Sequence, residues 1–271
     1  MKNIWIFFIL LSAAAYAGEV IHIELPTTTP ENRILKFSIR PPINKAPRHI
    51  MVLFGGRNWN GDKTIKTYGF NALADKNGII LISPWFKNDN YWEPEKWSGK
   101  ALLEAVDTLR RRYKISDQAQ LFYYGYSAGG QCAALFYTWR PELVAAWGAH
   151  ACGVWFDPDK TACTAPAVIT CGRRDTGRCE LSFNTVQRWR DRGAETVWRA
   201  YNSGHELNKE ALKLAHAFFE SQLNGDRSIK YIGDDQTGKF YPASRENQRK
   251  IPEDLRSAFR SLDTAQLWAG E

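Results

Sequence analysis

The feature that most constrains this chain is a regular alternation between short β-rich runs and stretches with helical periodicity. The predicted strands of this pattern cover 49–54, 79–83, 120–124, 143–149, 167–171 and 196–201, and the predicted helices cover 64–76, 100–113, 128–139, 180–192 and 206–223. In 100–113 the apolar residues fall at 102, 103, 106 and 109, which is the spacing of one helix face. Because strands separated by helices form βαβ units, we expect an α/β fold with a mostly parallel central sheet and helices on both faces.

The two ends of the chain depart from this alternation. The strand-like runs 21–25 and 33–39 have no helix between them, so we expect a hairpin-type addition at one edge of the sheet. From Asn224 onward Gly, Asp, Lys, Pro and Arg dominate, with a short helix predicted near 252–262. This part has too few apolar residues for a core of its own. We therefore interpret 18–223 as a catalytic domain and 224–271 as a tail that wraps it.

The first 17 residues are typical of a secretory signal peptide. A positive start at Lys2 is followed by an apolar run over 4–15, and Ala15-Tyr16-Ala17 has small residues where a signal peptidase cleaves. The alternative is a membrane anchor, but about 20 apolar residues are needed to cross a bilayer. We predict a secreted or periplasmic protein without a stable membrane anchor.

Export makes disulfides possible for the five cysteines. Four of them crowd between positions 152 and 179, and we favour the pairs Cys171–Cys179 and Cys152–Cys163, although four cysteines allow three pairings. A zinc site is the alternative, but it is disfavoured because no C-x₂-C pair is present. We expect Cys132 to be a small apolar core residue, and we predict neither a metal nor another cofactor.

A nucleophile motif lies between a predicted strand and a predicted helix. The sequence Gly125-Tyr126-Ser127-Ala128-Gly129 fits the pattern G-x-S-x-G. In this context the serine sits on a sharp turn that exposes its Oγ, and the glycines are small because neighbouring backbone approaches closely. The following helix directs its N-terminal N–H groups at the site. We predict Ser127 as a catalytic nucleophile, with a solvated serine in a structural turn as the alternative.

A serine nucleophile needs a histidine base, and the chain has five histidines. Only His205 lies in a loop between the last predicted strand and the last long helix, which is where the base belongs when the order is Ser, acid, His. The other four lie on or beside strands or within a helix, and we expect them to be structural: His22, His49, His150 and His216.

The acid that orients the base is expected in the loop after the preceding strand. Asp175 follows the run 167–171 and is our prediction. Asp157 and Asp159 are competitors that lie one loop too early. Glu180 is a further competitor, but it lies at a helix start, where capping is a sufficient explanation.

An oxyanion hole requires two backbone N–H donors. Ala128, directly after the nucleophile, supplies one of them. Phe54-Gly55-Gly56-Arg57 follows an earlier strand, and we assign the second donor to Gly56, with Arg57 as the alternative. The glycine pair is no nucleotide-binding fingerprint, because a third glycine is missing.

With these residues in place, the sequence resembles the α/β-hydrolase superfamily. The stretch from Ile115 to Gly130, in which an Asp-containing turn and a strand precede Gly125-Tyr126-Ser127-Ala128-Gly129-Gly130, is similar to secreted esterases related to polyhydroxybutyrate depolymerases and to feruloyl or acetylxylan esterases. The resemblance covers roughly 48–223 and implies a cofactor-free ester hydrolase that uses Ser127, Asp175 and His205. Phe54 departs from the pattern, because many relatives carry a histidine there.

The substrate clues are aromatic and cationic. The chain has 11 Trp, 11 Tyr and 14 Phe, and five aromatics lie between 84 and 98, after a strand whose end should border the site. The candidate substrate-binding residues are Arg57, Trp85, Trp92, Trp97 and Trp155. Four arginines could add positive charge suited to acidic groups such as uronates, although we favour salt bridges and solvation as their explanation: Arg57, Arg173, Arg174 and Arg178.

The formal net charge of +7 does not indicate nucleic-acid binding, because the basic residues are spread along the chain. We predict a secreted serine esterase for small or polymeric esters, namely plant-polysaccharide acetyl or feruloyl esters or short polyesters. A serine peptidase of the same fold is the first alternative, and a non-catalytic binding protein is the second.

Overall fold

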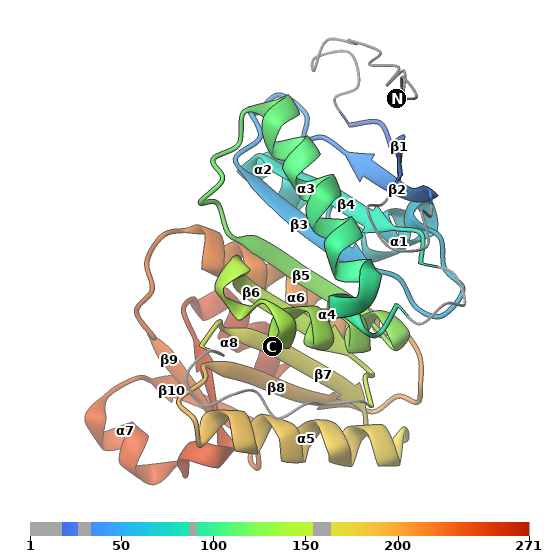
Figure 1. Ribbon diagram of the computed structural model, residues 1–271. Helices are drawn as coiled ribbons and strands as arrows, with labels where there is room; N and C mark the ends of the chain where they lie inside the picture. Colours follow the sequence, from blue (N-terminus) through green and yellow to red (C-terminus); the bar gives the residue numbers. More distant parts are fainter. Residues whose placement is uncertain (1–17, 27–33, 87–90, 154–163, 271) are drawn as a thin grey trace, which may run out of the picture.

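Eight strands form one sheet in the order β1-β2-β4-β3-β5-β6-β7-β8 in the computed structural model (Figure 1). The structure describes residues 18–26, 34–86, 91–153 and 164–270, so the predicted signal peptide lies outside it. β1 and β2 pair antiparallel at one edge, as predicted, and β2 is antiparallel to β4. The pairs from β4 to β8 are all parallel. The strands are β1 Ile21–Pro26, β2 Ile34–Arg40, β3 His49–Phe54, β4 Ile79–Pro84, β5 Leu121–Tyr126, β6 Val144–His150, β7 Ala167–Gly172 and β8 Thr196–Tyr201.

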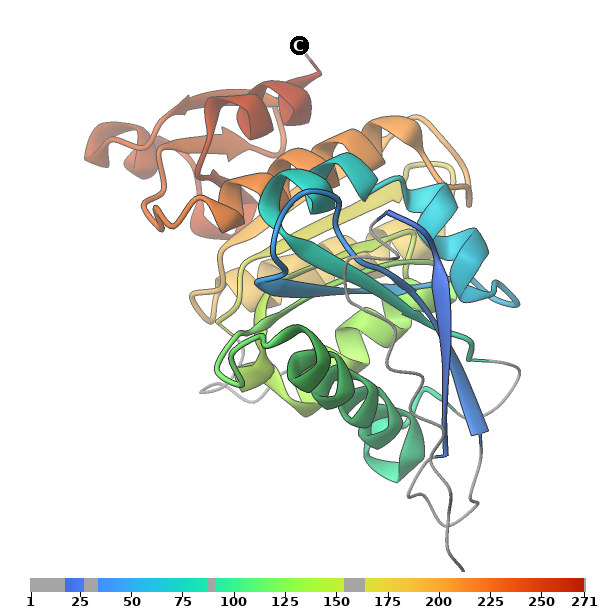
Figure 2. The ribbon, with the colours of Figure 1, turned by 90° about the horizontal axis from the view of Figure 1, so that it is seen from above.

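Helices connect the parallel strands and cover both faces of the sheet. The α-helices of this part are α1 Gly61–Tyr68, α2 Asn71–Asn77, α3 Gly99–Tyr113, α4 Ala128–Trp139, α5 Thr176–Arg190 and α6 Lys209–Leu223. Two short turns of other helical types are η2 Pro94–Ser98 and η3 Pro141–Leu143. Figure 2 shows α1, α2 and α6 on one side of the sheet and α3 and α4 on the other. Among the described residues, no helix combines the length and the apolar character needed to cross a membrane.

The core has two layers because successive side chains of a strand point to opposite faces of the sheet. In β3, Ile50, Val52 and Phe54 pack with α3, α4 and α5. Met51 and Leu53 pack on the other face with α1, α2 and α6. A strand buried on both faces must be apolar throughout, which explains the continuous apolar runs of the central strands.

The predicted helix over 64–76 is wrong in one respect, because the chain forms two helices there. Asn60 caps the start of α1, its side chain accepting a hydrogen bond from the Lys63 N–H. Gly69 then adopts a left-handed conformation with φ 67° and ends α1. Glycine reaches this conformation without the steric penalty of a Cβ, so it stops a helix efficiently.

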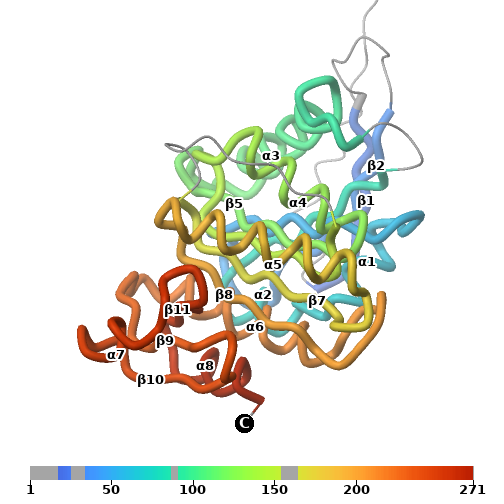
Figure 3. The backbone as a smooth tube through the Cα atoms, turned by 90° about the horizontal axis from the view of Figure 1, so that it is seen from below, coloured from blue at the N-terminus to red at the C-terminus, as the bar shows by residue number. Residues whose placement is uncertain are grey.

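The C-terminal segment, residues 224–270, contains a small sheet of its own. Its strands pair antiparallel in the order β10-β9-β11, and Figure 3 shows the segment in red beside β8 and α6. Its elements are β9 Tyr231–Asp234, β10 Lys239–Pro242, α7 Arg245–Lys250, η4 Glu253–Leu255, β11 Arg256–Phe259 and α8 Leu262–Ala269. The helix predicted near 252–262 is therefore wrong. Pairing with β9 draws 256–259 into a strand, and the helix begins only at Leu262.

The C-terminal segment satisfies the otherwise unpaired edge of β8. The Ser257 Oγ accepts a hydrogen bond from the Trp198 N–H at 2.9 Å, and the Trp268 Nε1–H donates to the Trp198 carbonyl. A buried ion pair between Arg190 of α5 and Asp235 joins the segment to the main domain at 2.6 Å. An uncovered edge strand invites pairing with other chains, so this arrangement protects the sheet.

Candidate active site

Ser127 lies on a strained turn between β5 and α4. Its backbone has φ 54° and ψ −119°, a conformation that non-glycine residues rarely adopt. A Cβ on Gly125 would lie 2.0 Å from the Gly129 carbonyl oxygen, and one on Gly129 would lie 1.9 Å from the Phe54 carbonyl oxygen. The prediction that close backbone approach requires both glycines is therefore confirmed.

The structure brings the three predicted triad residues into one hydrogen-bonded chain. The Ser127 Oγ lies 2.9 Å from His205 Nε2, and His205 Nδ1 lies 2.7 Å from Asp175 Oδ2. The side chain of Asp175 is 9% exposed and that of His205 is 35% exposed. The three residues follow β5, β7 and β8, whose carboxyl ends meet at one edge of the sheet. This geometry allows His205 to take a proton from the serine while Asp175 holds the imidazole in place.

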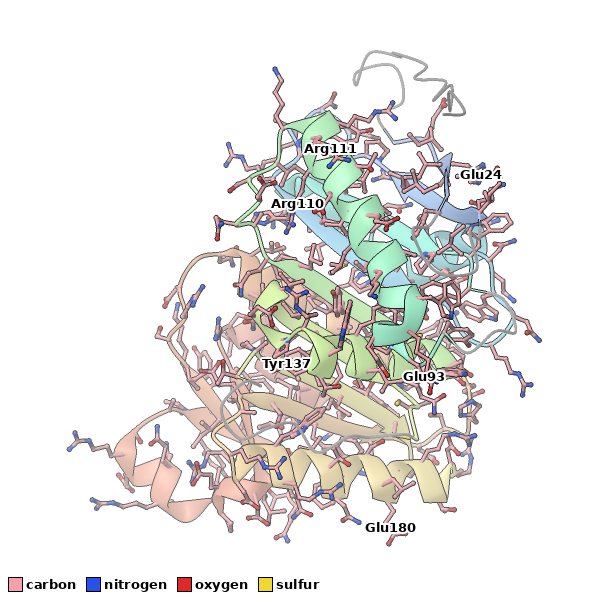
Figure 4. All side chains as sticks on the ribbon, in the orientation of Figure 1. Glu24, Glu93, Arg110, Arg111, Tyr137 and Glu180 are labelled. Atoms are coloured by element: carbon pink, nitrogen blue, oxygen red, sulfur yellow. The ribbon has the colours of Figure 1, made fainter. Side chains whose placement is uncertain are left out.

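Of the competing acids only Glu180 lies in the described structure, and it does not pair with the histidine. Glu180 lies on the outer side of α5 (Figure 4), where it is exposed to solvent. Asp157 and Asp159 lie outside the described residues. A second contact instead ties Asp175 to its own helix, because Arg178 Nη1 donates to Asp175 Oδ1 at 2.9 Å. Asp175 therefore accepts one hydrogen bond on each carboxylate oxygen.

His150 is completely buried and supports the loop that carries His205. Its Nδ1 lies 2.8 Å from the Thr170 Oγ1, and its Nε2 lies 2.9 Å from the backbone carbonyl oxygen of Glu206. The ring of Tyr126 is stacked with the rings of both histidines, at 5.8 Å from His150 and 5.6 Å from His205. Burial lowers the pKa of His150 from 6.5 to about 4, so the imidazole is neutral near pH 7. The sequence indicated a structural histidine here but not that it contacts the loop of His205.

Tyr68 joins the two loops that flank the nucleophile. Its buried hydroxyl donates to the Phe54 carbonyl oxygen at 2.7 Å and accepts from the Tyr126 N–H at 2.9 Å. One hydroxyl thus fixes the end of β3 relative to the end of β5. No sequence signal marked this residue, because it lies on α1, far from the motif in the chain.

The predicted oxyanion donors differ in their access to the site. Ala128 is the first residue of α4 and lines the cavity that contains Ser127. Gly56 is buried and is absent from the cavity wall, whereas its alternative Arg57 belongs to that wall. The loop that both residues share packs against the start of α4 through the close contact of Gly129 with Phe54.

The cavity at Ser127 has a volume of about 630 Å³ and an aromatic wall. Tyr91 and Trp92 form this wall, with ring centroids 4.1 Å apart. The structure does not bring two predicted aromatics to the cavity. The Trp85 side chain turns toward the antiparallel strands, where its Nε1–H donates a hydrogen bond to the Ser38 Oγ of β2. Trp97 is buried in the core against α3, and the fifth candidate, Trp155, lies outside the described residues.

Three arginines line the same cavity: Arg57 in the loop after β3, Arg174 in the loop after β7 and Arg178 in the first turn of α5. Arg178 pairs with Asp175, and Arg174 donates to the neutral side-chain oxygen of Asn202 at 2.9 Å. Arg57 is exposed, and among the described residues no acidic side chain lies within ion-pair distance of either Arg57 or Arg174. Of the four arginines named from the sequence, Arg178 therefore forms a salt bridge, and Arg57, Arg173 and Arg174 are exposed to solvent.

The predicted disulfide between Cys171 and Cys179 is not formed. Cys171 and Cys179 are free thiols, although the end of β7 and the first turn of α5 bring them into a hydrogen bond. This bond, together with burial, raises the pKa of the Cys171 thiol, so it keeps its proton. Cys152 is buried, and the predicted pair Cys152–Cys163 stays a prediction because Cys163 lies outside the described residues. Cys132 is a core residue at 1% exposure, which confirms its prediction.

Comparison with known proteins finds similar solved structures, but no family model and no curated protein matches the sequence. The chain is similar to a thermostable esterase, with a TM-score of 0.56 and 16% identity over 68% of this chain and 55% of that one. It is similar to a ferulic acid esterase, with a TM-score of 0.60 and 13% identity over 77% of this chain and 97% of that one. It is also similar to LpqC, a poly(3-hydroxybutyrate) depolymerase from Bordetella parapertussis, with a TM-score of 0.58 and 17% identity over 74% of this chain and 89% of that one.

These comparisons show the fold and not the activity, because all three identities are low. The chain also spans only about half of the thermostable esterase. The chain has the α/β-hydrolase fold, as its sequence predicted.

Proposed function

We propose that this protein is a serine carboxylic-ester hydrolase. The observation that carries the proposal is the hydrogen-bonded chain from Ser127 through His205 to Asp175, set at the N-terminus of α4. A purely structural role for the serine on its strained turn would not explain why a histidine and a carboxylate form a hydrogen-bonded chain with it. Strain of this kind persists where the surroundings hold it in place for a function.

The proposed reaction has two steps. The Ser127 Oγ attacks the ester carbonyl carbon, and His205 Nε2 takes the serine proton, while Asp175 stabilises the imidazolium. The tetrahedral intermediate then collapses, the C–O bond to the alcohol breaks, and His205 returns the proton to the leaving oxygen. Water, activated by the same histidine, attacks the acyl-enzyme and releases the acid and the free serine.

Backbone N–H groups would stabilise the negative charge on the intermediate. Ala128 is one donor, and the loop of Gly56 and Arg57 would supply the second. Because α4 begins at Ala128, its dipole also favours negative charge at this point. Loss of one such donor typically costs about 3 kcal/mol of transition-state stabilisation.

The aromatic wall supports carbohydrate or aromatic esters as substrates. Tyr91 and Trp92 offer ring faces beside the nucleophile, and such faces stack on sugar rings and phenolic acids. A ferulic acid esterase and a polyhydroxybutyrate depolymerase are among the structurally similar proteins. We therefore propose that the substrates are polysaccharide acetyl or feruloyl esters, or short polyesters. We also propose that the enzyme is secreted or periplasmic.

The test compares Ser127→Ala with the wild type on p-nitrophenyl acetate. The exposed Ser228, which lies outside the cavity, offers a matched control as Ser228→Ala. We expect Ser127→Ala to lose at least about 10³-fold in kcat and the control to lose nothing. A fluorophosphonate probe should label the wild type and the control but not Ser127→Ala.

Undiminished hydrolysis by Ser127→Ala would refute the assignment. A panel of acetylated xylan, methyl ferulate, polyhydroxybutyrate and peptides then defines the class of substrate. Cleavage of the peptides alone would favour a peptidase. A complete lack of turnover and labelling would favour a binding protein on the same fold.

A further inference from the structure

We propose that the cavity at Ser127 selects esters that carry a carboxylate group on the acid or alcohol part. This inference rests on the proposed esterase function and adds the charge of the substrate to it. The juxtaposition that carries it is that of Arg57 and Arg174 in one cavity wall with the nucleophile, where neither arginine has an acidic partner among the described residues.

The charges that line the cavity do not balance. Its charged side chains are Arg57, Arg174, Arg178 and Asp175. Asp175 is already engaged by His205 on one oxygen and by Arg178 on the other, so it neutralises Arg178. Arg57 and Arg174 remain, which leaves an excess of two positive charges among the described residues of this concave site. A concave wall of one charge sign concentrates ligands of the opposite sign.

The hydrogen bonds of the two arginines leave most of their donors available. Arg174 makes its side-chain hydrogen bond to an amide oxygen of Asn202, which carries no charge. A guanidinium has five N–H donors in a planar fork that matches the two oxygens of a carboxylate. The arginines are thus suited to a carboxylate, whereas a neutral ester would leave them to solvent.

The positions of the two arginines bracket the reacting carbonyl. Arg57 follows β3, which pairs directly with β5 below Ser127, and Arg174 follows β7, two strands beyond β5 on the other side. Neighbouring strands lie about 4.8 Å apart, so the strand ends that carry the arginines are about 5 and 10 Å from that of the serine. A carboxylate separated from the ester by a few carbon atoms can therefore reach Arg57 or Arg174.

The rest of the wall fits an apolar connecting chain. Tyr91, Trp92 and Leu181 line the cavity between its polar parts. A substrate with a charged end and an apolar or ring-shaped body would meet complementary groups at both ends. Within the described part of this wall Asp175 is the single acidic residue, so no second described acid would repel a carboxylate there.

The test uses two p-nitrophenyl esters of matched length. The monoester of adipic acid carries a carboxylate where the hexanoate ester carries a methyl group. The measured quantity is the ratio of kcat/KM for the adipate monoester to that for the hexanoate, corrected for spontaneous hydrolysis. Because it is a ratio, any general loss of activity in a variant cancels.

We expect a ratio of about ten or more in the wild type at low ionic strength. The double variant Arg57→Gln/Arg174→Gln should bring it close to one, and Arg174→Glu should bring it below the wild-type value. Arg173→Gln is the matched control, since Arg173 is an exposed neighbour that does not line the cavity, and it should keep the wild-type ratio. Raising the salt to about 1 M should also lower the wild-type ratio, because the Debye length falls to about 3 Å.

Each outcome bears on a different claim. A wild-type ratio near one, or a raised ratio that the double variant preserves, would overturn this inference while the esterase assignment stands. A lowered ratio in the Arg173→Gln control to the same extent as in the double variant would also overturn it. Failure to hydrolyse either ester, or hydrolysis that survives Ser127→Ala, would instead overturn the proposed function.

Discussion

The buried imidazole of His150 should make the protein lose stability as the pH falls. The folded protein keeps this group neutral because burial lowers its pKa to about 4, whereas the unfolded chain protonates it at its ordinary value of 6.5. Between these two values the unfolded state binds more protons, so the free energy of unfolding decreases as the pH decreases. Above the unfolded pKa both states are neutral and the group has no pH effect.

The size of the loss follows from the two pKa values. One pKa unit corresponds to about 1.4 kcal/mol, and the loss is progressive. Between about pH 7.5 and pH 5 it amounts to about 2 kcal/mol, and it levels off at about 3 kcal/mol below pH 4. A loss of about 2 kcal/mol is a substantial part of the 5–15 kcal/mol that is typical of a folded domain.

The assay is urea unfolding of the wild type and of His150→Gln at several pH values. Glutamine keeps a donor for the Glu206 carbonyl oxygen but does not titrate. We expect His150→Gln to have a lower free energy of unfolding than the wild type at pH 7.5. The difference between the two proteins should be smaller by about 2 kcal/mol at pH 5. Thr170→Val is the control, because it removes the partner of Nδ1 and keeps the titrating ring. It should retain the full pH dependence.

The reasoning would be refuted if the difference in the free energy of unfolding between His150→Gln and the wild type stays constant between pH 7.5 and pH 5. The comparison between variants is needed because other groups titrate in the same range. Burial raises the pKa of Asp235 to about 6, for example, and an acid with a raised pKa stabilises the folded state as the pH falls. This opposite contribution is common to all three proteins and cancels.

Three further predictions concern the geometry around the nucleophile. Tyr68→Phe removes the hydroxyl that pairs with the Phe54 carbonyl oxygen and with the Tyr126 N–H. Urea unfolding should therefore show that the free energy of unfolding falls by about 2–4 kcal/mol. Steady-state kinetics should show a lower kcat with little change in KM. Gly129→Ala places a Cβ 1.9 Å from the Phe54 carbonyl oxygen and should reduce kcat/KM by about 10²-fold. Gly177→Ala, whose added Cβ has no neighbouring atom within 4 Å, should have the kcat/KM of the wild type. Asp175→Asn should lower kcat by about 10⁴-fold in the same assay, because the histidine loses the partner that selects its tautomer, and a loss below tenfold would contradict that role.

The local parts of the fold could be predicted because they follow from local chemistry. The limits of β3, α4 and β8 agree with the sequence prediction residue for residue, since apolar runs and periodicity depend only on neighbours in the chain. The positions of Ser127, Asp175 and His205 after their strands could be predicted for the same reason. The break at Gly69 and the strand at 256–259 could not, because a tight turn and a pairing partner overrode the helical pattern there.

The contacts between loops depended on the order of the strands in space. Tyr68 reaches across from α1 to the ends of β3 and β5, and His150 reaches from β6 to the loop after β8. The two predicted tryptophans on the loop after β4 diverged, because one turned to the β2 edge and the other to the core. Side-chain direction in a loop depends on what packs against it, which periodicity does not encode.

The sequence by itself therefore determined the α/β architecture, the sharp serine turn and the identity of the two residues, His205 and Asp175, that line up behind the serine. These features need only a short motif and the alternation of strands and helices. Only the tertiary structure decided which arginines find acidic partners, which aromatics line the cavity and that Cys171 and Cys179 are hydrogen-bonded thiols. Those outcomes depend on the distances between residues far apart in the chain, and the packing of the whole domain sets these distances.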